Sequence, residues 1–209
     1  MQEHDPAFDV ELMIRVANGD RNALCSLMER WEAPLGGFIY RYVQNREATS
    51  ELVQETFVRL YEARARFRTD MRFSSWLFRI AANLCRNYHR WRCRHPEDMA
   101  WDESCEAVNT PAPGVAREEA DPAAVAERRE EIRRLKDAIS EMPHQLKTAL
   151  LLHYYEDMSY RDIAQAVGCS ERGVETRLYR ARAWLAKAFG RSSGSDRSDC
   201  GAIAAGGLL

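Results

Sequence analysis

Residues 64–95 read RARFRTDMRFSSWLFRIAANLCRNYHRWRCRH, and this stretch decides how the rest of the chain is interpreted. It holds nine arginines and a single acid, Asp70, with six aromatic residues between them. Arginine binds phosphates and stacks on planar groups, and aromatic faces stack on unpaired bases. From Ser75 onward, apolar residues recur at helical spacing, so some of these aromatics belong to a core. The stretch predicts a basic amphipathic helix that binds nucleic acid, single strands in particular.

Charge is strongly segregated along the 209 residues, although the net charge is only −2. Basic residues number six against eleven acids in 1–63 and nine against one in 64–95. Residues 96–123 hold one basic residue and eight acids, and residues 124–190 hold twelve basic residues and ten acids. The overall composition therefore says little about partners, whereas the blocks predict a nucleic-acid-binding segment followed by an acidic linker.

The first twenty residues are charged throughout and lack the apolar segment of a signal peptide. No apolar run approaches the ~20 residues of a membrane span. We therefore expect a cytoplasmic protein without membrane insertion, whose six cysteines are reduced.

Helical periodicity dominates the sequence and period-two alternation is absent, so we expect an all-α fold of two small helical domains joined by a flexible acidic linker. Pro34 is expected to kink or break the second helix. Ser74 or Ser75 is expected to cap the basic helix. The expected helices cover residues 9–17, 20–43, 47–66, 75–93, 122–141, 144–156, 160–167 and 171–189.

The C-terminal part of the chain predicts a helix-turn-helix. Ala164, Gly168 and Val174 supply a small residue where two helices touch, a glycine for the turn, and a branched residue that locks the second helix. Ser159 and Ser170 are placed to cap the two helices. From Arg172 to Lys187 the second helix carries five basic residues against one acid, Glu175, which is typical of a helix that reads duplex DNA.

A metal site and an enzyme are both poorly supported. Cys85, His89 and Cys93 share one helix face and are of zinc-ligand types, but three ligands strung along one helix span ~12 Å. That is too far for one ion without a fourth element, so we expect no metal and no cofactor. No phosphate-binding glycine loop and no catalytic motif is present, and we expect no enzymatic activity.

Three segments together resemble a known family. They are ELVQETFVRLYE (51–62), FRTDMRFSSWLFRIAANLCRNY (67–88) and MSYRDIAQAVGCSERGVETRLYRARAWL (158–185). Their order and spacing are similar to those of bacterial extracytoplasmic-function (ECF) RNA polymerase sigma factors, over about residues 9–189. Such a protein binds core RNA polymerase and directs it to promoters by reading the −35 duplex and capturing melted −10 bases.

The resemblance implies a division of the chain into four parts. These are sigma domain 2 at 1–93, an acidic linker at 94–123, sigma domain 4 with the helix-turn-helix at 124–189, and a disordered tail at 190–209. It also implies three partners: core RNA polymerase, promoter DNA, and an anti-sigma factor.

The resemblance assigns site residues as follows. The expected polymerase contacts are Glu51, Gln54, Glu55, Arg59 and Glu62. The expected −10 contacts are Phe67, Arg68, Asp70, Phe73, Trp76, Arg79, Asn83, Arg86 and Asn87. The expected −35 contacts are Arg172, Glu175, Thr176, Arg177, Tyr179, Arg180 and Arg182. Glu175 and Gly173 depart from the basic and β-branched residues that are frequent at these positions in the family.

Two other interpretations remain open from the sequence. A stand-alone helix-turn-helix regulator would bind duplex DNA without polymerase, and would leave the 64–95 aromatics and the 51–62 face unused. A protein-interaction module would use its basic block on an acidic partner, and charge reversal at Arg172 and Arg180 would then leave its function intact.

Overall fold

The computed structural model describes residues 5–95 and 122–190 of the chain, with side chains given from 126 to 189 in the second part. Most of the expected acidic linker, at 96–121, and the expected tail beyond Gly190 lie outside the described residues.

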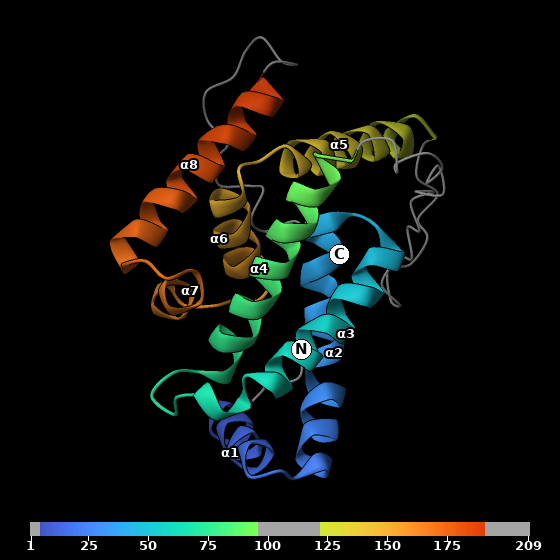
Figure 1. Ribbon diagram of the computed structural model, residues 1–209. Helices are drawn as coiled ribbons and strands as arrows, with labels where there is room; N and C mark the ends of the chain where they lie inside the picture. The colour runs from blue at the N-terminus through green and yellow to red at the C-terminus, as the bar shows by residue number, and fades with distance from the viewer. Residues whose placement is uncertain (1–4, 96–121, 191–209) are drawn as a thin grey trace.

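The described residues form an all-α structure without strands, which confirms the expected fold class (Figure 1). An N-terminal module holds four helices and a short 3-10 turn, η1 (Arg64–Arg66). A C-terminal module holds the other four helices. The helices are α1 (Pro6–Ala17), α2 (Arg21–Val43), α3 (Arg46–Glu62), α4 (Phe73–Arg92), α5 (Pro122–Ser140), α6 (His144–Tyr154), α7 (Tyr160–Val167) and α8 (Glu171–Gly190).

Side-chain caps fix where several of these helices begin. The Asp20 carboxylate accepts hydrogen bonds from the backbone N–H groups of Asn22 and Ala23 at the start of α2. Asn45 Oδ1 accepts from the N–H of Ala48 at 2.7 Å at the start of α3. These bonds satisfy amide donors that the first turn of a helix leaves unpaired.

Two local features differ from expectation, namely the absence of a break at Pro34 and the absence of a serine cap on α4. Helix α2 runs unbroken through Pro34, because the buried side chains on both sides of it, such as Trp31, Leu35 and Phe38, outweigh one lost backbone hydrogen bond. Helix α4 begins at Phe73 with Arg72 at the cap position and no side-chain cap bond, so neither serine caps it.

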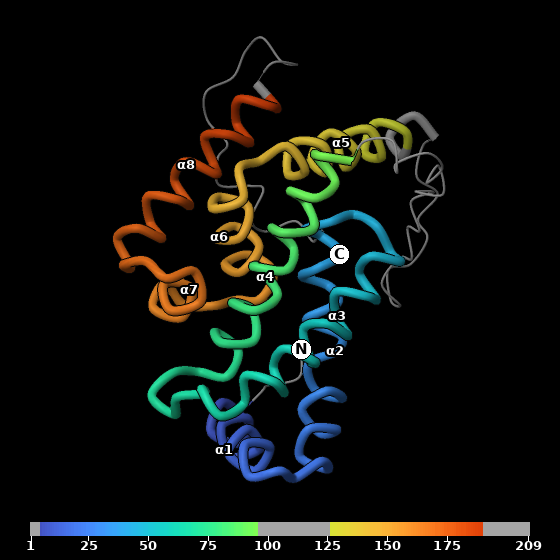
Figure 2. Tube along the Cα trace, viewed as in Figure 1, coloured from blue at the N-terminus to red at the C-terminus, as the bar shows by residue number. Residues whose placement is uncertain are grey.

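Helix α4 lies at the centre of the structure and contacts α1, α2 and α3 of its own module and α7 of the other (Figure 2). Its buried side chains include Leu77, Phe78, Ala81 and Cys85, each at most 1% exposed. One continuous apolar core extends from these residues into α6, α7 and α8. The two expected domains are therefore packed together in this structure, and α4 is part of the core of both.

Replacing Leu77 with alanine tests this central position. Leu77→Ala removes a side chain with no exposed surface, and we expect it to lower the free energy of unfolding by ~2–5 kcal/mol in urea denaturation. The control is Val58→Ala on α3, where the side chain is 51% exposed and the change should stay within ~0.5 kcal/mol. Equal losses for the two variants would contradict the placement of α4.

Candidate nucleic-acid interface

The outer face of α4 carries the polar half of the expected −10 site. Arg79, Asn83, Arg86 and Asn87 are all exposed, while the residues between them, such as Leu84, are buried. Their spacing of three or four residues places them along one side of the helix. The structure therefore brings these four residues together on a surface that can meet a nucleic-acid strand.

Two of the expected −10 aromatics lie in the core instead. Phe73 is 1% exposed and packs on Trp31 with ring centroids 5.7 Å apart. Trp76 is 9% exposed and packs on Phe67 at 5.2 Å. In this arrangement Phe73 and Trp76 support the loop before α4, and only the half-buried Phe67 presents part of its ring to solvent.

The loop before α4 is closed by a charge pair at its tip. Arg68 donates to both carboxylate oxygens of Asp70, at 3.0 and 2.7 Å, and this pair lowers the pKa of Asp70. Both side chains are largely exposed, so the pair adds little to stability. It holds Arg68 and Asp70 side by side at the position where an extruded base is expected.

The helix-turn-helix has the expected geometry. Gly168 ends α7 with a φ of 67°, a backbone conformation that favours glycine. Val174 is fully buried under the turn. Ser159 accepts a hydrogen bond from the N–H of Asp162, and Ser170 accepts one from the N–H of Gly173, so both expected caps are confirmed.

The packing around position 173 explains why this residue is a glycine. A Cβ there would lie 3.3 Å from Cys169 Sγ and 3.4 Å from Ser170 Oγ, which is tighter than ordinary contact. The departure from a β-branched residue therefore makes room for the Cys169 thiol and the Ser170 cap.

The expected −35 contacts divide into two groups on α8. Arg172, Glu175, Thr176, Tyr179 and Arg180 are all exposed, and the Tyr179 side chain is 72% exposed. These five form a free face on the second helix of the motif.

Arg182 and Arg177 lie to the side of this face. Arg182 donates to the hydroxyl of Tyr154 on α6 at 2.9 Å, a bond that raises the pKa of Arg182. Arg177 is half-buried, and its charge acts on His144 of α6. The structure thus ties Arg182 to α6, while Arg177 lies close enough to α6 for its charge to lower the pKa of His144.

The expected polymerase face of α3 is open to solvent. Glu51, Gln54 and Glu62 are exposed, and Arg59 donates to Glu55 at 2.6 Å across one helical turn. Sequence reasoning missed Val58, an apolar side chain that is 51% exposed within this face. The signal was present, because position 58 falls outside the apolar stripe of Val53, Phe57 and Leu60.

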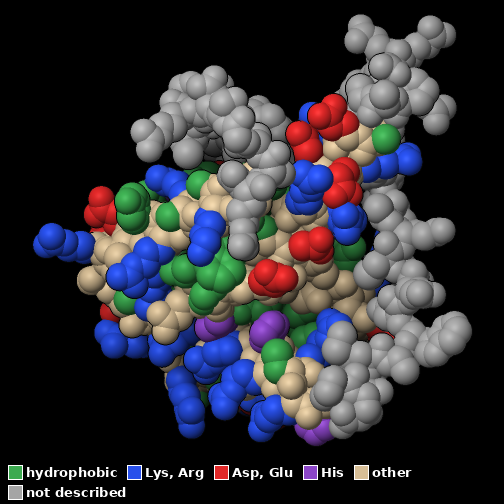
Figure 3. Space-filling view, turned by 90° about the horizontal axis from the view of Figure 1, so that it is seen from above, with side chains coloured by type: hydrophobic (Ala, Val, Ile, Leu, Met, Phe, Trp, Pro, Cys, Tyr) green, Lys and Arg blue, Asp and Glu red, His purple; other side chains and the backbone are tan. Residues whose placement is uncertain are grey.

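Basic side chains gather on one part of the molecular surface (Figure 3). Viewed from above, Lys and Arg side chains crowd the area below two neighbouring His side chains (Figure 3). A cluster of this kind attracts polyanions through a field that salt screens.

The cysteine and histidine residues of α4 do not gather into a metal site. Cys93 Sγ lies 3.7 Å from His89 Nδ1, while Cys85 is buried in the core. Within residues 5–95 and 122–190, no three His, Cys, Asp or Glu side chains are grouped as metal ligands. None of the helices in these ranges is both long and apolar enough to span a membrane.

Family comparisons agree with the order of the two modules. A family model described as Sigma-70 region 2 matches residues 27–94, and one described as Sigma-70, region 4 matches residues 132–185. The RNA polymerase sigma-H factor of Pseudomonas aeruginosa is 33% identical over 191 residues, which cover 87% of this chain and 93% of that protein. The ECF RNA polymerase sigma-E factor of Escherichia coli strain K12 is 33% identical over 175 residues, covering 83% and 90%.

Two solved structures have a similar fold. CnrH, in complex with the cytosolic domain of CnrY, has a TM-score of 0.64 and 24% identity over 89% of this chain and 99% of that chain. The sigma factor RpoE, in complex with the anti-sigma factor NepR from Bartonella quintana, has a TM-score of 0.53 and 20% identity over 80% and 97%.

Thiol labelling tests the burial of Cys85. Burial raises the pKa of this thiol to about 12, so little thiolate forms and we expect no reaction with iodoacetamide until the protein is denatured. The exposed Cys25 and Cys93 should react in the native protein and serve as internal controls. Mass spectrometry of peptides would read all three sites. Native labelling of Cys85 as fast as that of Cys93 would contradict the core position.

Proposed function

The chain belongs to the extracytoplasmic-function sigma factors of the sigma-70 family, and from that premise we propose which of its residues carry out promoter recognition. A sigma factor directs RNA polymerase to promoters through regions 2 and 4 and has no enzymatic activity of its own. The observation that carries the proposal is α4, with one face buried in the core and a row of arginines and asparagines exposed on the other.

The exposed face of α4 binds the melted −10 strand. Arg79 and Arg86 hold phosphates, and Asn83 reads a base edge. The Arg68–Asp70 pair and the open side of Phe67 receive a flipped base, whose extrusion costs a few kcal/mol that stacking and edge hydrogen bonds recover. Phe73 and Trp76 act indirectly, by supporting Phe67 from the core.

The free face of α8 reads the −35 duplex in the major groove. Arg172 and Arg180 favour guanine, while Glu175 accepts a hydrogen bond from cytosine. Arg177 and Arg182 contact the DNA backbone from beside this face. The outward face of α3, from Glu51 to Glu62 and including Val58, docks on core polymerase.

The chain divides into sigma domain 2 at 1–93, an acidic linker at 94–123, sigma domain 4 at 124–189, and a tail from 190. The protein acts in the cytoplasm, where an anti-sigma factor binds and inhibits it. Support for that partner comes from CnrH and RpoE, each of which is solved with a bound protein, named an anti-sigma factor in the case of RpoE.

Polymerase docking is tested by the double variant Gln54→Ala/Glu55→Lys. It removes one exposed polar contact and reverses one charge on α3, and we expect binding to core polymerase to weaken at least about tenfold, with loss of co-elution in gel filtration. The control is Glu11→Lys, a charge reversal at an exposed position of α1. Unchanged co-elution of the double variant would remove α3 from the docking face.

Duplex recognition is tested with Arg180→Ala. One bidentate arginine–guanine pair is worth ~1–3 kcal/mol of discrimination, so the holoenzyme should lose most of its preference for a promoter with an intact −35 element over one with a scrambled element. Quantitative footprinting measures that ratio. Arg128→Ala, at an exposed position of α5, is the matched control. A ratio that stays at the wild-type value would exclude Arg180 from base reading.

A further inference from the structure

A small cluster of aromatic and basic side chains lies where α6, α7 and α8 meet, beside the free face of α8. Arg182 of α8 donates from Nε to the hydroxyl of Tyr154 at 2.9 Å. Tyr154 is the last residue of α6, and Tyr160 is the first residue of α7. Both tyrosines raise the pKa of Arg182, and the hydrogen bond to Tyr154 has the largest effect. One arginine is therefore held by side chains from two other helices.

His153 packs between the two tyrosine rings. Its ring meets that of Tyr154 edge-on with the centroids 4.9 Å apart, and it meets that of Tyr160 edge-on at 5.3 Å. Aromatic rings attract one another in this geometry. His153 and Tyr160 are half-buried, whereas Tyr154 and Arg182 are exposed. The cluster thus has a packed aromatic base and carries its charged group at the surface.

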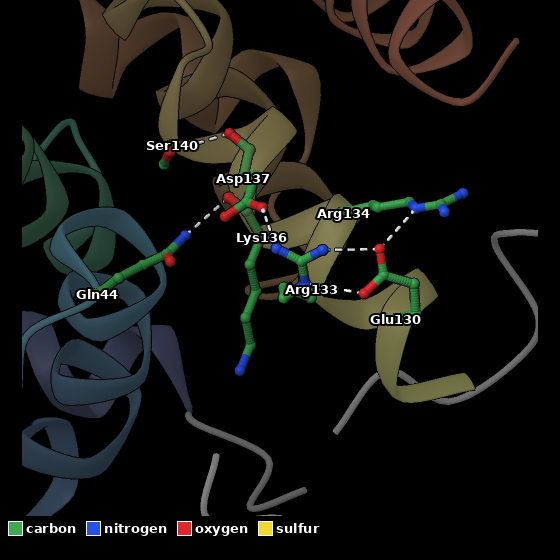
Figure 4. A network of polar contacts seen from close by, with 7 residues as sticks. All are labelled: Gln44, Glu130, Arg133, Arg134, Lys136, Asp137 and Ser140. Atoms are coloured by element: carbon green, nitrogen blue, oxygen red, sulfur yellow. Dashed lines mark hydrogen bonds and ion pairs between the residues drawn. The ribbon is translucent and has the colours of Figure 1, made fainter. Parts of the chain in front are cut away.

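The partners of Arg182 leave its charge available to a ligand. A phenol hydroxyl is neutral at physiological pH, so it orients the guanidinium without cancelling the positive charge. The arginines of α5 are held differently, because Arg133 and Arg134 both donate to the carboxylate of Glu130 (Figure 4). These bonds lower the pKa of Glu130 to about 2, so its negative charge persists and offsets theirs. The α5 network is balanced within the protein, whereas Arg182 is suited to an anion.

The bond to Tyr154 also prepares Arg182 for a phosphate. A guanidinium has five N–H donors in one plane, and two of them can grip two phosphate oxygens at once. Because Nε donates to Tyr154, the plane is fixed while donors on the terminal nitrogens remain for a ligand. An arginine already held in this way loses less side-chain freedom when it binds, and that favours affinity.

The position of Arg182 in the motif indicates which anion it meets. It lies about two turns, or ~10 Å, beyond Glu175 along α8. In a helix-turn-helix the start of the second helix contacts base edges, while the first helix crosses the DNA backbone. Tyr160 opens that first helix, α7, and acts on Arg182. The cluster therefore lies at the level of the backbone rather than of the bases.

We propose that the hydroxyls of Tyr154 and Tyr160 hold the Arg182 guanidinium ready for one backbone phosphate of the −35 duplex, so that both tyrosines are positioning residues for DNA binding. The proposal rests on the proposed function, because α8 has to lie in the major groove for Arg182 to reach that phosphate. Such a contact adds affinity without sequence preference, since phosphates are alike at every base pair.

A double-mutant cycle on the reconstituted holoenzyme tests the proposal. Tyr154→Phe removes the hydroxyl that accepts from Arg182 and keeps the ring that packs on His153. Arg182→Ala removes the phosphate contact itself. Tyr40→Phe, the same loss of a hydroxyl at an exposed position of α2, is the matched control. Titration of fluorescent promoter DNA gives the Kd of each holoenzyme, on promoters with an intact and with a scrambled −35 element.

We expect Arg182→Ala to weaken binding about tenfold and Tyr154→Phe about three- to fivefold, by the same factor on both promoters. The double variant should bind as Arg182→Ala does, because the hydroxyl then has no arginine to hold. Tyr160→Phe should weaken binding about twofold, since Tyr160 acts on Arg182 less than Tyr154 does. Tyr40→Phe should match wild type.

Neutral methylphosphonates, placed one at a time along the −35 duplex, locate the contact. Among the positions where this change weakens binding of the wild-type holoenzyme, one should have no effect with Arg182→Ala, because its charge partner is gone. Tyr154→Phe should reduce the effect at that same position and leave the others unchanged. A general loosening of the fold would instead alter all positions alike.

Three results would overturn the positioning role. They are wild-type affinity of Tyr154→Phe, an equal loss from Tyr154→Phe with and without Arg182, and an unchanged methylphosphonate effect at the Arg182 position. If the wild-type chain does not bind core polymerase, the proposed function fails. The same cycle on duplex DNA bound by the free chain then still decides whether Tyr154 acts through Arg182.

Discussion

The structure depends on the packing of α4, a helix with one face in the apolar core and the opposite face in water. Leu77, Phe78, Ala81 and Cys85 are withdrawn from water by α1, α2, α3 and α7, and their burial holds the N-terminal module together. The opposite face exposes Arg79, Asn83, Arg86 and Asn87 to water, where polar groups carry no desolvation cost. Because the backbone of α4 is fixed by the core, its polar face is rigid before any nucleic acid arrives, which lowers the entropy lost on binding.

The same helix also connects the two modules. Ser75, one residue before Trp76, bonds to α7 in a buried position, and the apolar core continues from α4 into α6 and α8. The helix that is proposed to bind single-stranded DNA is thus also part of the packing between the two modules. The buried ammonium of Lys147 lies at this junction, where it donates to the backbone carbonyls of Tyr42 and Ser140, and burial lowers its pKa to about 8.

The sequence predicted the elements well and their long-range contacts poorly. Helical periodicity and short-range capping residues such as Asp20, Ser159 and Ser170 act within a few residues, and they place most helix ends correctly. Local rules failed at Pro34 and at the start of α4, where burial of Phe38 and Phe73 outweighs backbone preferences. The sequence also did not indicate that Phe73 and Trp76 would be buried, because an aromatic residue in a basic segment can serve the core or the ligand. The bond between Lys147 and Tyr42 joins residues 105 positions apart, and no periodicity encodes such a pairing.

The most direct measurement is strand opening at the −10 element by the reconstituted holoenzyme, followed with a fluorescent base analogue in the promoter. With Asn83→Ala on the exposed face of α4, the account predicts that polymerase binding persists while the opening signal falls by about tenfold or more, since a lost base-edge pair is worth ~1–3 kcal/mol. Opening at the wild-type level by this variant, or opening of the duplex by the isolated chain without polymerase, would contradict it.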